Sequence, residues 1–139
     1  KNDYGILTLV DKMKAIIVAG IVFVTTSLTV QQPASMKDIA RITACMEKQN
    51  CKNIILAKGY GGELGWQVVF IDSGKRYTFY WPGRHERIRS WLAVWARPNG
   101  TQGREQLVYC SDDGPDGLVD DGSQELYNEA IAVAVRQLL

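Results

Sequence analysis

The chain has 139 residues, of which 46% are hydrophobic and 22% are charged, and its formal net charge is +1. These values are typical of an ordinary globular protein, and the charge gives no indication of a polyanionic partner. The length favours a single domain with one hydrophobic core. A single histidine and the lack of a Cys-x-x-Cys pair in the sequence argue against a zinc site.

An uncharged apolar tract, AIIVAGIVFVTTSLTV, covers residues 15–30 and is closed by Pro33. It is shorter than the roughly 20 apolar residues that a membrane-spanning helix needs, but the lysines just before it can snorkel. Four interpretations are open: an anchoring or assembly helix, the apolar region of a signal peptide, a buried helix, and buried strands. We expect residues 1–34 to form a hydrophobic anchor or assembly segment and residues 35–139 to form a globular domain.

The start of the chain carries a recognisable pattern. Gly5 precedes the run Thr-Leu-Val-Asp that ends at Asp11, and Gly20 follows inside the apolar tract. This arrangement resembles the N-terminus of type IV pilins and type II secretion pseudopilins. The resemblance implies a subunit that packs a hydrophobic helix, here residues 5–30, into an envelope filament. Asp11 would then neutralise the N-terminus of a neighbouring subunit, because a lone charge in lipid needs a partner.

A helix is predicted directly after the apolar segment. Ser35 and Asp38 fit a capping box, in which the serine satisfies free N–H groups of the first turn and the carboxylate reaches back. Apolar residues at helical spacing continue behind it, so we predict a helix over residues 36–49.

The chain has three cysteines, Cys45, Cys51 and Cys110. The first two are close enough in sequence to form a disulfide if the chain turns between them. In an exported protein we expect Cys45 to pair with Cys51 and Cys110 to stay free. In a cytosolic protein, all three would be buried thiols.

Several short segments have the composition of strands. Residues 53–58 form an apolar run that suits a buried strand. Residues 66–72 and 76–81 flank a glycine-containing turn and predict a hairpin. Residues 106–110 predict a further strand.

The segment 84–97 fits two patterns. As a helix it places five apolar residues on one face: Ile88, Trp91, Leu92, Trp95 and Ala96. As a strand it divides its residues between two faces: Ile88, Leu92 and Val94 on one, and Arg89, Trp91, Trp95 and Arg97 on the other. We favour the helix.

A last helix is predicted after Ser123, which can cap it, with Glu125 in the first turn where the helix dipole favours a negative charge. The order of elements is helix, helix, several short strands, then helix, and most links have the length of hairpin connections. We therefore expect an α+β fold, in which an N-terminal hydrophobic helix precedes a small antiparallel sheet flanked by helices.

A glycine- and aspartate-rich stretch, residues 111–122, is a candidate calcium site. Aligned with an EF-hand loop that starts at Asp112, it lacks ligands at Gly114 and Ser123, which leaves a partial site. The candidate ligands are Asp112, Asp116, Leu118, Asp120 and Asp121. The segment 109–117 also resembles the C-terminal Ser-x-Gly-x-Asp-Gly stretch of major pseudopilins, which binds calcium in that family. The alternative is a solvated turn, since turns also use Asp, Gly and Pro.

Residues 75–97 combine cationic and aromatic side chains, with Glu86 as the single acid. Guanidinium groups beside stacking faces suit single-stranded nucleic acid or an acidic polymer. The alternative is an aromatic core with arginines in solvent. The candidate ligand-binding residues are Arg84, Arg87, Arg89, Trp91, Trp95 and Arg97.

Nothing in the spacing of His85, Cys110 and Ser111 forms a nucleophilic signature, so we expect a protein without enzymatic activity. We expect a structural or assembly subunit of a cell-envelope or extracellular filament, anchored in the membrane and self-associating through its N-terminal helix. The alternative is an extracytoplasmic binding module whose basic and aromatic surface holds an anionic ligand or nucleic acid. A third interpretation is an intracellular α/β protein in which the apolar tract forms core strands.

Overall fold

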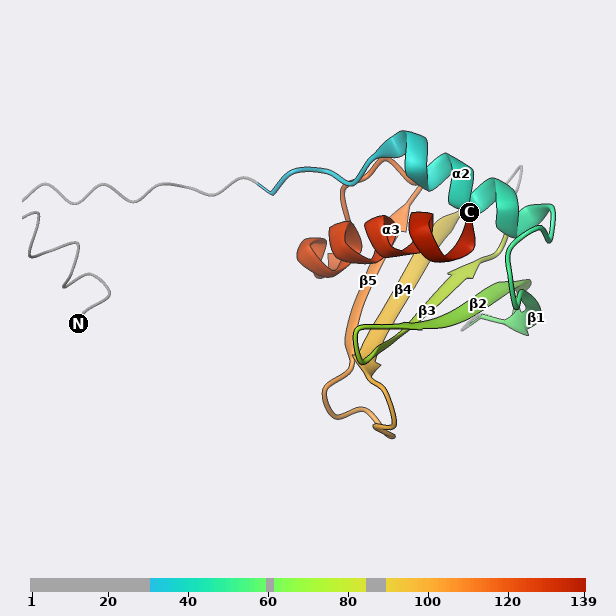
Figure 1. The fold of residues 1–139 in the computed structure, drawn as a ribbon. Coiled ribbons are helices and arrows are strands. Elements are labelled where there is room, and N and C mark those ends of the chain that lie inside the picture. Colours follow the sequence, from blue (N-terminus) through green and yellow to red (C-terminus); the bar gives the residue numbers. More distant parts are fainter. Residues whose placement is uncertain (1–30, 60–61, 85–89) are drawn as a thin grey trace, which may run out of the picture. The chain divides into compact units, whose positions relative to one another are not determined.

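The computed structural model describes residues 31–59, 62–84 and 90–139 (Figure 1). The chain divides into two units, residues 1–30 and 31–139, and the second contains every described residue. The predicted N-terminal helix, with Asp11 and Gly20, lies outside the described residues. Neither helix in the described part of the chain is long and apolar enough to cross a membrane.

Six strands form one antiparallel sheet in the order of the chain. The strands are Ile55–Lys58 (β1), Leu64–Asp72 (β2), Lys75–Trp81 (β3), Trp91–Pro98 (β4), Val108–Asp113 (β5) and Asp121–Gly122 (β6). Each strand pairs with its neighbour in sequence, and the central register aligns Phe79 with Val94 and Val94 with Cys110. The expected α+β fold with an antiparallel sheet is confirmed for the described residues, as is the hairpin formed by β2 and β3.

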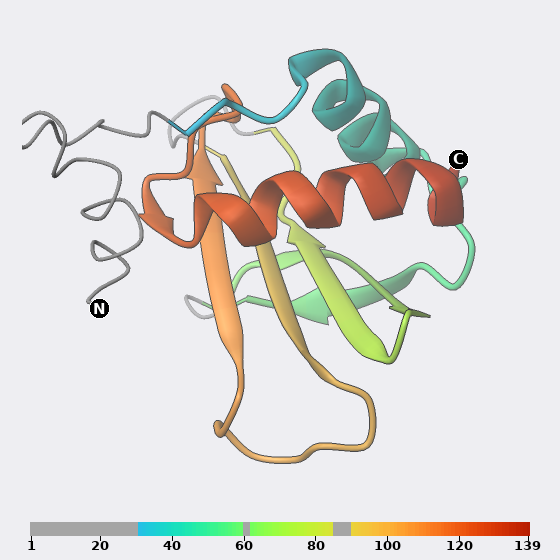
Figure 2. The ribbon, with the colours of Figure 1, turned by 60° about the vertical axis from the view of Figure 1, so that its left-hand side comes forward.

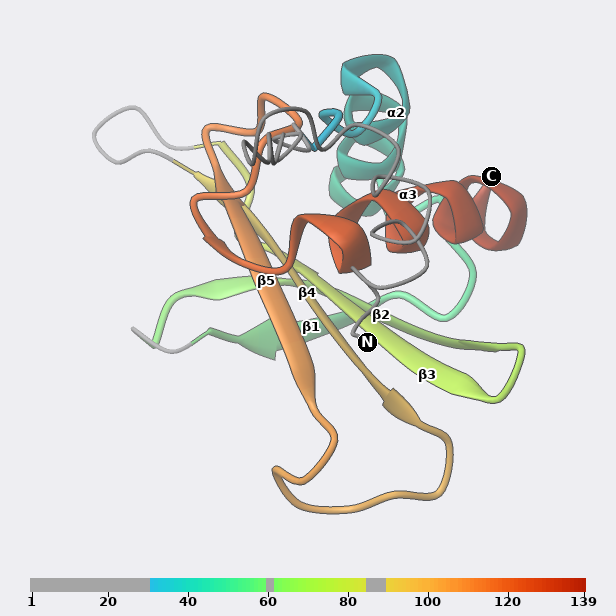
Figure 3. The ribbon, with the colours of Figure 1, turned by 90° about the vertical axis from the view of Figure 1, so that its left-hand side faces the viewer.

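Two helices, Met36–Glu47 (α2) and Gln124–Leu138 (α3), cover the same face of the sheet (Figures 2 and 3). The side chain of Ser35 accepts a hydrogen bond from the N–H of Asp38 at 3.2 Å, and that of Ser123 accepts one from Leu126 at 3.0 Å. These caps satisfy N–H groups that the first turn leaves free, which fixes where each helix begins. Both predicted helices are confirmed.

The hydrophobic core lies between the helices and this face. Alternate residues of the strands point into it, as the two-residue period of a strand requires. The strand residues buried in the core are Val68, Tyr77, Phe79, Trp81, Leu92, Val94, Ala96 and Cys110. The helices contribute Ile39, Ile42, Met46, Leu126, Tyr127, Ala130, Ile131, Val133, Ala134 and Leu138.

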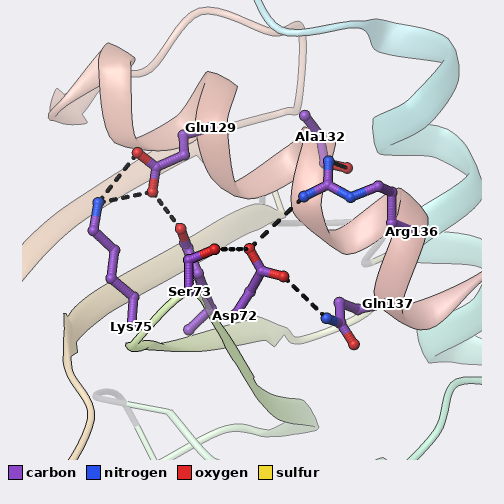
Figure 4. Close-up of polar contacts among 8 residues, drawn as sticks. Asp72, Ser73, Lys75, Glu129, Ala132, Arg136 and Gln137 are labelled. Atoms are coloured by element: carbon purple, nitrogen blue, oxygen red, sulfur yellow. Dashed lines mark hydrogen bonds and ion pairs between the residues drawn. The ribbon is translucent and has the colours of Figure 1, made fainter.

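Polar contacts join α3 to the turn between β2 and β3 (Figure 4). Lys75 and the hydroxyl of Tyr77 both donate to the carboxylate of Glu129, with a Lys75–Glu129 distance of 3.0 Å. Two turns further along α3, Gln137 donates to Asp72 at 3.2 Å, and the guanidinium of Arg136 lies 3.7 Å from the same carboxylate. These contacts hold the helix across the strands. Neither described helix packs on the opposite face of the sheet (Figures 2 and 3).

The predicted helix over residues 84–97 is wrong for its second half, where Trp91–Pro98 form strand β4. Leu92 and Val94 point into the core, whereas Trp91, Trp95 and Arg97 lie on the other face. The alternative strand pattern described this division correctly. A helical stripe and a strand alternation both fit these residues, and pairing with β3 and β5 on either side decides between them.

Two other expectations need correction. Strand β1, predicted as buried, is an edge strand whose Ile55 and Leu56 are 53% and 57% exposed. The composition of β1 suits a central strand or an edge strand. Only the sheet order shows that one side of β1 has no described strand beside it. Strand β5 continues to Asp113, so the first three residues of the predicted loop at 111–122 lie in the sheet. Asp112 can occupy a buried strand position because its carboxylate is fully hydrogen-bonded, as described below.

A disulfide joins Cys45 and Cys51, whose Cα atoms are 5.4 Å apart, while Cys110 is a buried free thiol. The turn after α2 brings the first two cysteines together, as expected for an exported protein. The disulfide links the end of α2 to the segment that leads into β1.

Candidate functional site: the open face of the sheet

The face of the sheet opposite the helices, hereafter the open face, carries an unusual set of side chains. The strands place on it Gln67, Thr78, Tyr80, Trp91, Ala93, Trp95, Arg97 and Tyr109. Four of these eight residues are aromatic, although the hydrophobic core lies on the other side of the sheet. The open face is therefore where a ligand is to be sought.

Cross-strand pairing explains the shape of this face. Thr78, Trp95 and Tyr109 form one row across β3, β4 and β5, and Tyr80 pairs with Ala93 in the next row. The short side chains of Thr78 and Ala93 lie between large aromatic rings, which leaves a hollow of about 500 Å³. That volume falls within the roughly 300–1,000 Å³ of known ligand sites.

Two aromatic pairs border the hollow. The rings of Trp95 and Tyr109 have centroids 5.4 Å apart and are tilted by 48°. The rings of Tyr80 and Trp91 lie 6.3 Å apart with a tilt of 39°. Separations and tilts of this kind are favourable for aromatic rings, so the two rings of each pair hold one another in position.

Tyr80 is held in place by residues at and just before the start of β2. Its hydroxyl donates to the carbonyl oxygen of Glu63 at 3.1 Å. A Cβ at Gly65 would lie 2.7 Å from that hydroxyl, so only glycine leaves room for the tyrosine to cross β2 here. Burial, together with the charge of Glu63, raises the pKa of Tyr80 to about 12, so the hydroxyl stays protonated at physiological pH.

Cationic side chains surround the hollow. Arg76 and Arg97 are cross-strand partners, and each guanidinium donates to a carbonyl of the β4–β5 loop: Arg76 to Thr101 at 3.3 Å, and Arg97 to Gly103. This loop adds Arg104 to the rim, and Lys58 enters from β1. The described residues that line the hollow thus provide four cations, and none of them carries a carboxylate.

The predicted ligand-binding residues are only partly brought together. Trp91, Trp95 and Arg97 line the hollow. Arg84 lies elsewhere, with its Nε 4.0 Å from the carboxylate of Glu47 on α2. Arg87 and Arg89 lie outside the described residues. The lining residues that were absent from the predicted set include three cations, Lys58, Arg76 and Arg104, and two aromatic residues, Tyr80 and Tyr109.

The predicted calcium ligands form no such opening. Asp112 is fully buried, and its carboxylate accepts from the N–H of Asp116 at 3.2 Å, the N–H of Gly117 at 2.9 Å and the hydroxyl of Tyr127 at 2.8 Å. Burial raises the pKa of Asp112 above its usual value, while these three hydrogen bonds act in the opposite direction. The carboxylate organises the loop that follows it.

Two neighbouring aspartates bind the same loop. Asp120 accepts from the N–H of Asp113 at 2.6 Å, and Asp116 accepts from the N–H of Leu118 at 2.9 Å. Asp121 lies in β6, paired with Ser111. In the described part of the chain, no three carboxylate, histidine or cysteine side chains gather as a metal-binding group. Calcium binding by this loop stays a prediction.

Comparisons of the chain with protein-family models, with curated proteins and with solved structures gave no match. The expected pilin-like assembly depends on Asp11 and Gly20, which lie outside the described residues. The geometry and charge of the open face are therefore the features that bear on function.

Proposed function

We propose that the domain is a binding module that holds an anionic ligand on the open face of its sheet. The observation that carries the proposal is the hollow itself, which has aromatic walls, four cations and no carboxylate among its described lining residues. The net charge of the chain is only +1, yet four cations lie around this one hollow. Such a surface attracts anions and gives them flat apolar surfaces to rest on.

The alternative interpretation, an aromatic core with arginines in solvent, accounts for only part of the segment. Tyr77, Phe79 and Trp81 do belong to the core beneath the helices. Trp91 and Trp95 point the other way and line the hollow with Arg97. Both indole rings are only partly buried there, which leaves ring surface that a ligand can cover.

The proposal is tested by titrating the chain against fluorescent anionic polymers at low salt. In the variant Arg97→Gln/Arg104→Gln, binding should weaken, and the slope of log affinity against log salt should fall by about two, one for each lost cation. The matched control is Arg41→Gln/Arg136→Gln, which removes the same charge from α2 and α3.

The control variant should bind as the unmodified chain does. Equal weakening in both variants would mean that net charge alone attracts the polymers. Failure of the unmodified chain to bind oligonucleotide, polyphosphate and polyglutamate alike would overturn the proposed function.

We further propose that this module works in the cell envelope, attached by its N-terminal tract and self-associating through it. Two observations favour this setting: the compact unit begins at Gln31, directly after the apolar tract, and Cys45 is bonded to Cys51. Stable disulfides are typical of oxidising compartments. The native chain should then pellet with membranes or filaments, and Asp11→Asn should reduce assembly, whereas Asp38→Asn on α2 should not. A chain that stays in the supernatant would contradict this placement.

A further inference from the structure

On the basis of the proposed function, we infer that the anionic ligand is a single-stranded nucleic acid whose bases stack on the aromatic row of the open face. In this arrangement the phosphates lie over the neighbouring row of arginines. The nucleic acid then crosses β3, β4 and β5 at a steep angle to the direction of these β-strands. The β4–β5 loop forms one wall of its path.

The spacing of the two rows supports this assignment. The aromatic row consists of Trp95 and Tyr109, with Thr78 beside them, and the pair Arg76–Arg97 forms the adjacent row. Trp95 and Arg97 are two residues apart on β4, which separates the rows by about 7 Å. A nucleotide presents its base and its phosphate on opposite sides of the sugar, so one row can take bases while the other takes phosphates.

The chemistry of the lining residues separates a nucleic acid from other polyanions. An acidic polypeptide would use the four cations but would leave the aromatic walls without a partner. A neutral polysaccharide could stack on the aromatic rings but would leave the four cations without a charged partner. Nucleic acid bases have π-faces that stack on tryptophan and tyrosine irrespective of sequence.

A second aromatic pair lies on the same face, on the other side of the aromatic row from the arginines. Trp91 lies four residues before Trp95 on β4, about 13 Å along the same face, and packs beside Tyr80. Lys58 provides a cation at this end of the hollow, opposite Arg97 and Arg104. The face therefore offers stacking surfaces and a cation at both ends of the hollow.

The test compares a labelled oligo(dT) 12-mer with an abasic phosphodiester 12-mer of equal length and charge, using the full chain. Stacking is worth about 1–3 kcal/mol per base, so the oligo(dT) should bind roughly 5- to 150-fold more tightly for each base that stacks. Trp95→Leu should remove most of this difference and leave abasic binding unchanged. Trp95→Phe, which keeps a ring, should retain most of it.

The outcomes separate this inference from the proposed function. If no polyanion binds, both fail. If the abasic polymer, heparin or polyglutamate binds as tightly as oligo(dT), the open face holds anions but not bases, and only the nucleic acid assignment is overturned. Equal weakening of both 12-mers by Trp95→Leu would show a structural role for that ring and would also overturn the assignment.

Discussion

Tyr127→Phe offers a sharp test of how the fold is held together around Asp112. The tyrosine hydroxyl donates to the Asp112 carboxylate at 2.8 Å, and both side chains are 0% exposed. Water therefore cannot replace the hydroxyl, and the carboxylate keeps only its bonds to the N–H groups of Asp116 and Gly117. Hydrogen bonds to charged groups contribute about 1.5–3 kcal/mol. We expect the variant to lose about 2 kcal/mol of unfolding free energy at pH 8.

The loss should depend on pH, and its sign follows from the pKa of Asp112. Burial already raises this pKa, and the hydrogen bond from Tyr127 is one of the contacts that limit the rise. Removing the hydroxyl raises the folded-state pKa further. A carboxyl group whose pKa is higher in the folded state than in the unfolded state lowers stability as the pH rises through the folded value. The penalty of Tyr127→Phe should therefore be full at pH 8 and should shrink as the pH is lowered and Asp112 becomes protonated.

Urea unfolding followed by circular dichroism at pH 8 and pH 4 measures both quantities, and a loss of about 2 kcal/mol corresponds to roughly 10 °C in melting temperature. The matched control is Tyr77→Phe, whose hydroxyl donates to Glu129 at a site that solvent reaches. There water replaces the lost donor, so the cost should stay below about 1 kcal/mol. A cost for Tyr127→Phe that equals the control, or that does not shrink in acid, would refute the account of Asp112.

Three further predictions concern the cysteines and the aspartate loop. Burial, together with the charge of Asp112, raises the pKa of Cys110 to about 12, so iodoacetamide should modify Cys110 only in the unfolded chain; rapid modification of the native chain would contradict its burial. Reducing the Cys45–Cys51 disulfide, which spans six positions, should lower the unfolding free energy by about 2 kcal/mol through loop entropy, and an unchanged urea midpoint would contradict this. If the predicted calcium site exists, the melting temperature should rise with millimolar calcium but not with magnesium, and a melt insensitive to calcium would contradict the site. Asp120→Ala should cost about 1 kcal/mol of unfolding free energy even without calcium, because the N–H of Asp113 loses its acceptor.

The parts of the fold that could be predicted from the sequence are those fixed by local interactions. Ser35 and Ser123 cap helices through neighbours three residues away, and the glycine-containing turn after Asp72 joins adjacent strands. Each of these signals lies within a few residues of the element that it defines. They were therefore visible without knowledge of the tertiary structure.

The remaining features depend on pairing between distant segments. Residues 91–97 satisfy a helical stripe and a strand alternation equally, and only their position between β3 and β5 makes them a central strand. Asp112 lies in a composition that predicts a solvated turn, and its burial depends on Tyr127, fifteen positions away. Local patterns cannot report such partners.

The candidate site was predictable in the same partial way. Trp91, Trp95 and Arg97 could be found because they alternate within one segment. Arg104, Lys58 and Tyr109 come from separate segments and reach the hollow only because the sheet order places those segments around it. Once the register of β4 and β5 is known, strand alternation identifies Tyr109, whereas Lys58 and Arg104 follow only from where β1 and the β4–β5 loop lie around the hollow.

The four tryptophans of the chain allow the most direct test of the open-face account. Trp91 and Trp95 line the hollow, whereas Trp66 packs against the core and Trp81 is buried beneath the helices, donating to Glu47 at 2.7 Å. Fluorine NMR of the fluorotryptophan-labelled chain, with signals assigned by single Trp→Phe variants, can follow all four during titration with an oligonucleotide. We predict that the Trp91 and Trp95 signals shift while those of Trp66 and Trp81 stay in place. Saturable shifts at Trp66 and Trp81 with none at Trp91 and Trp95 would contradict the account.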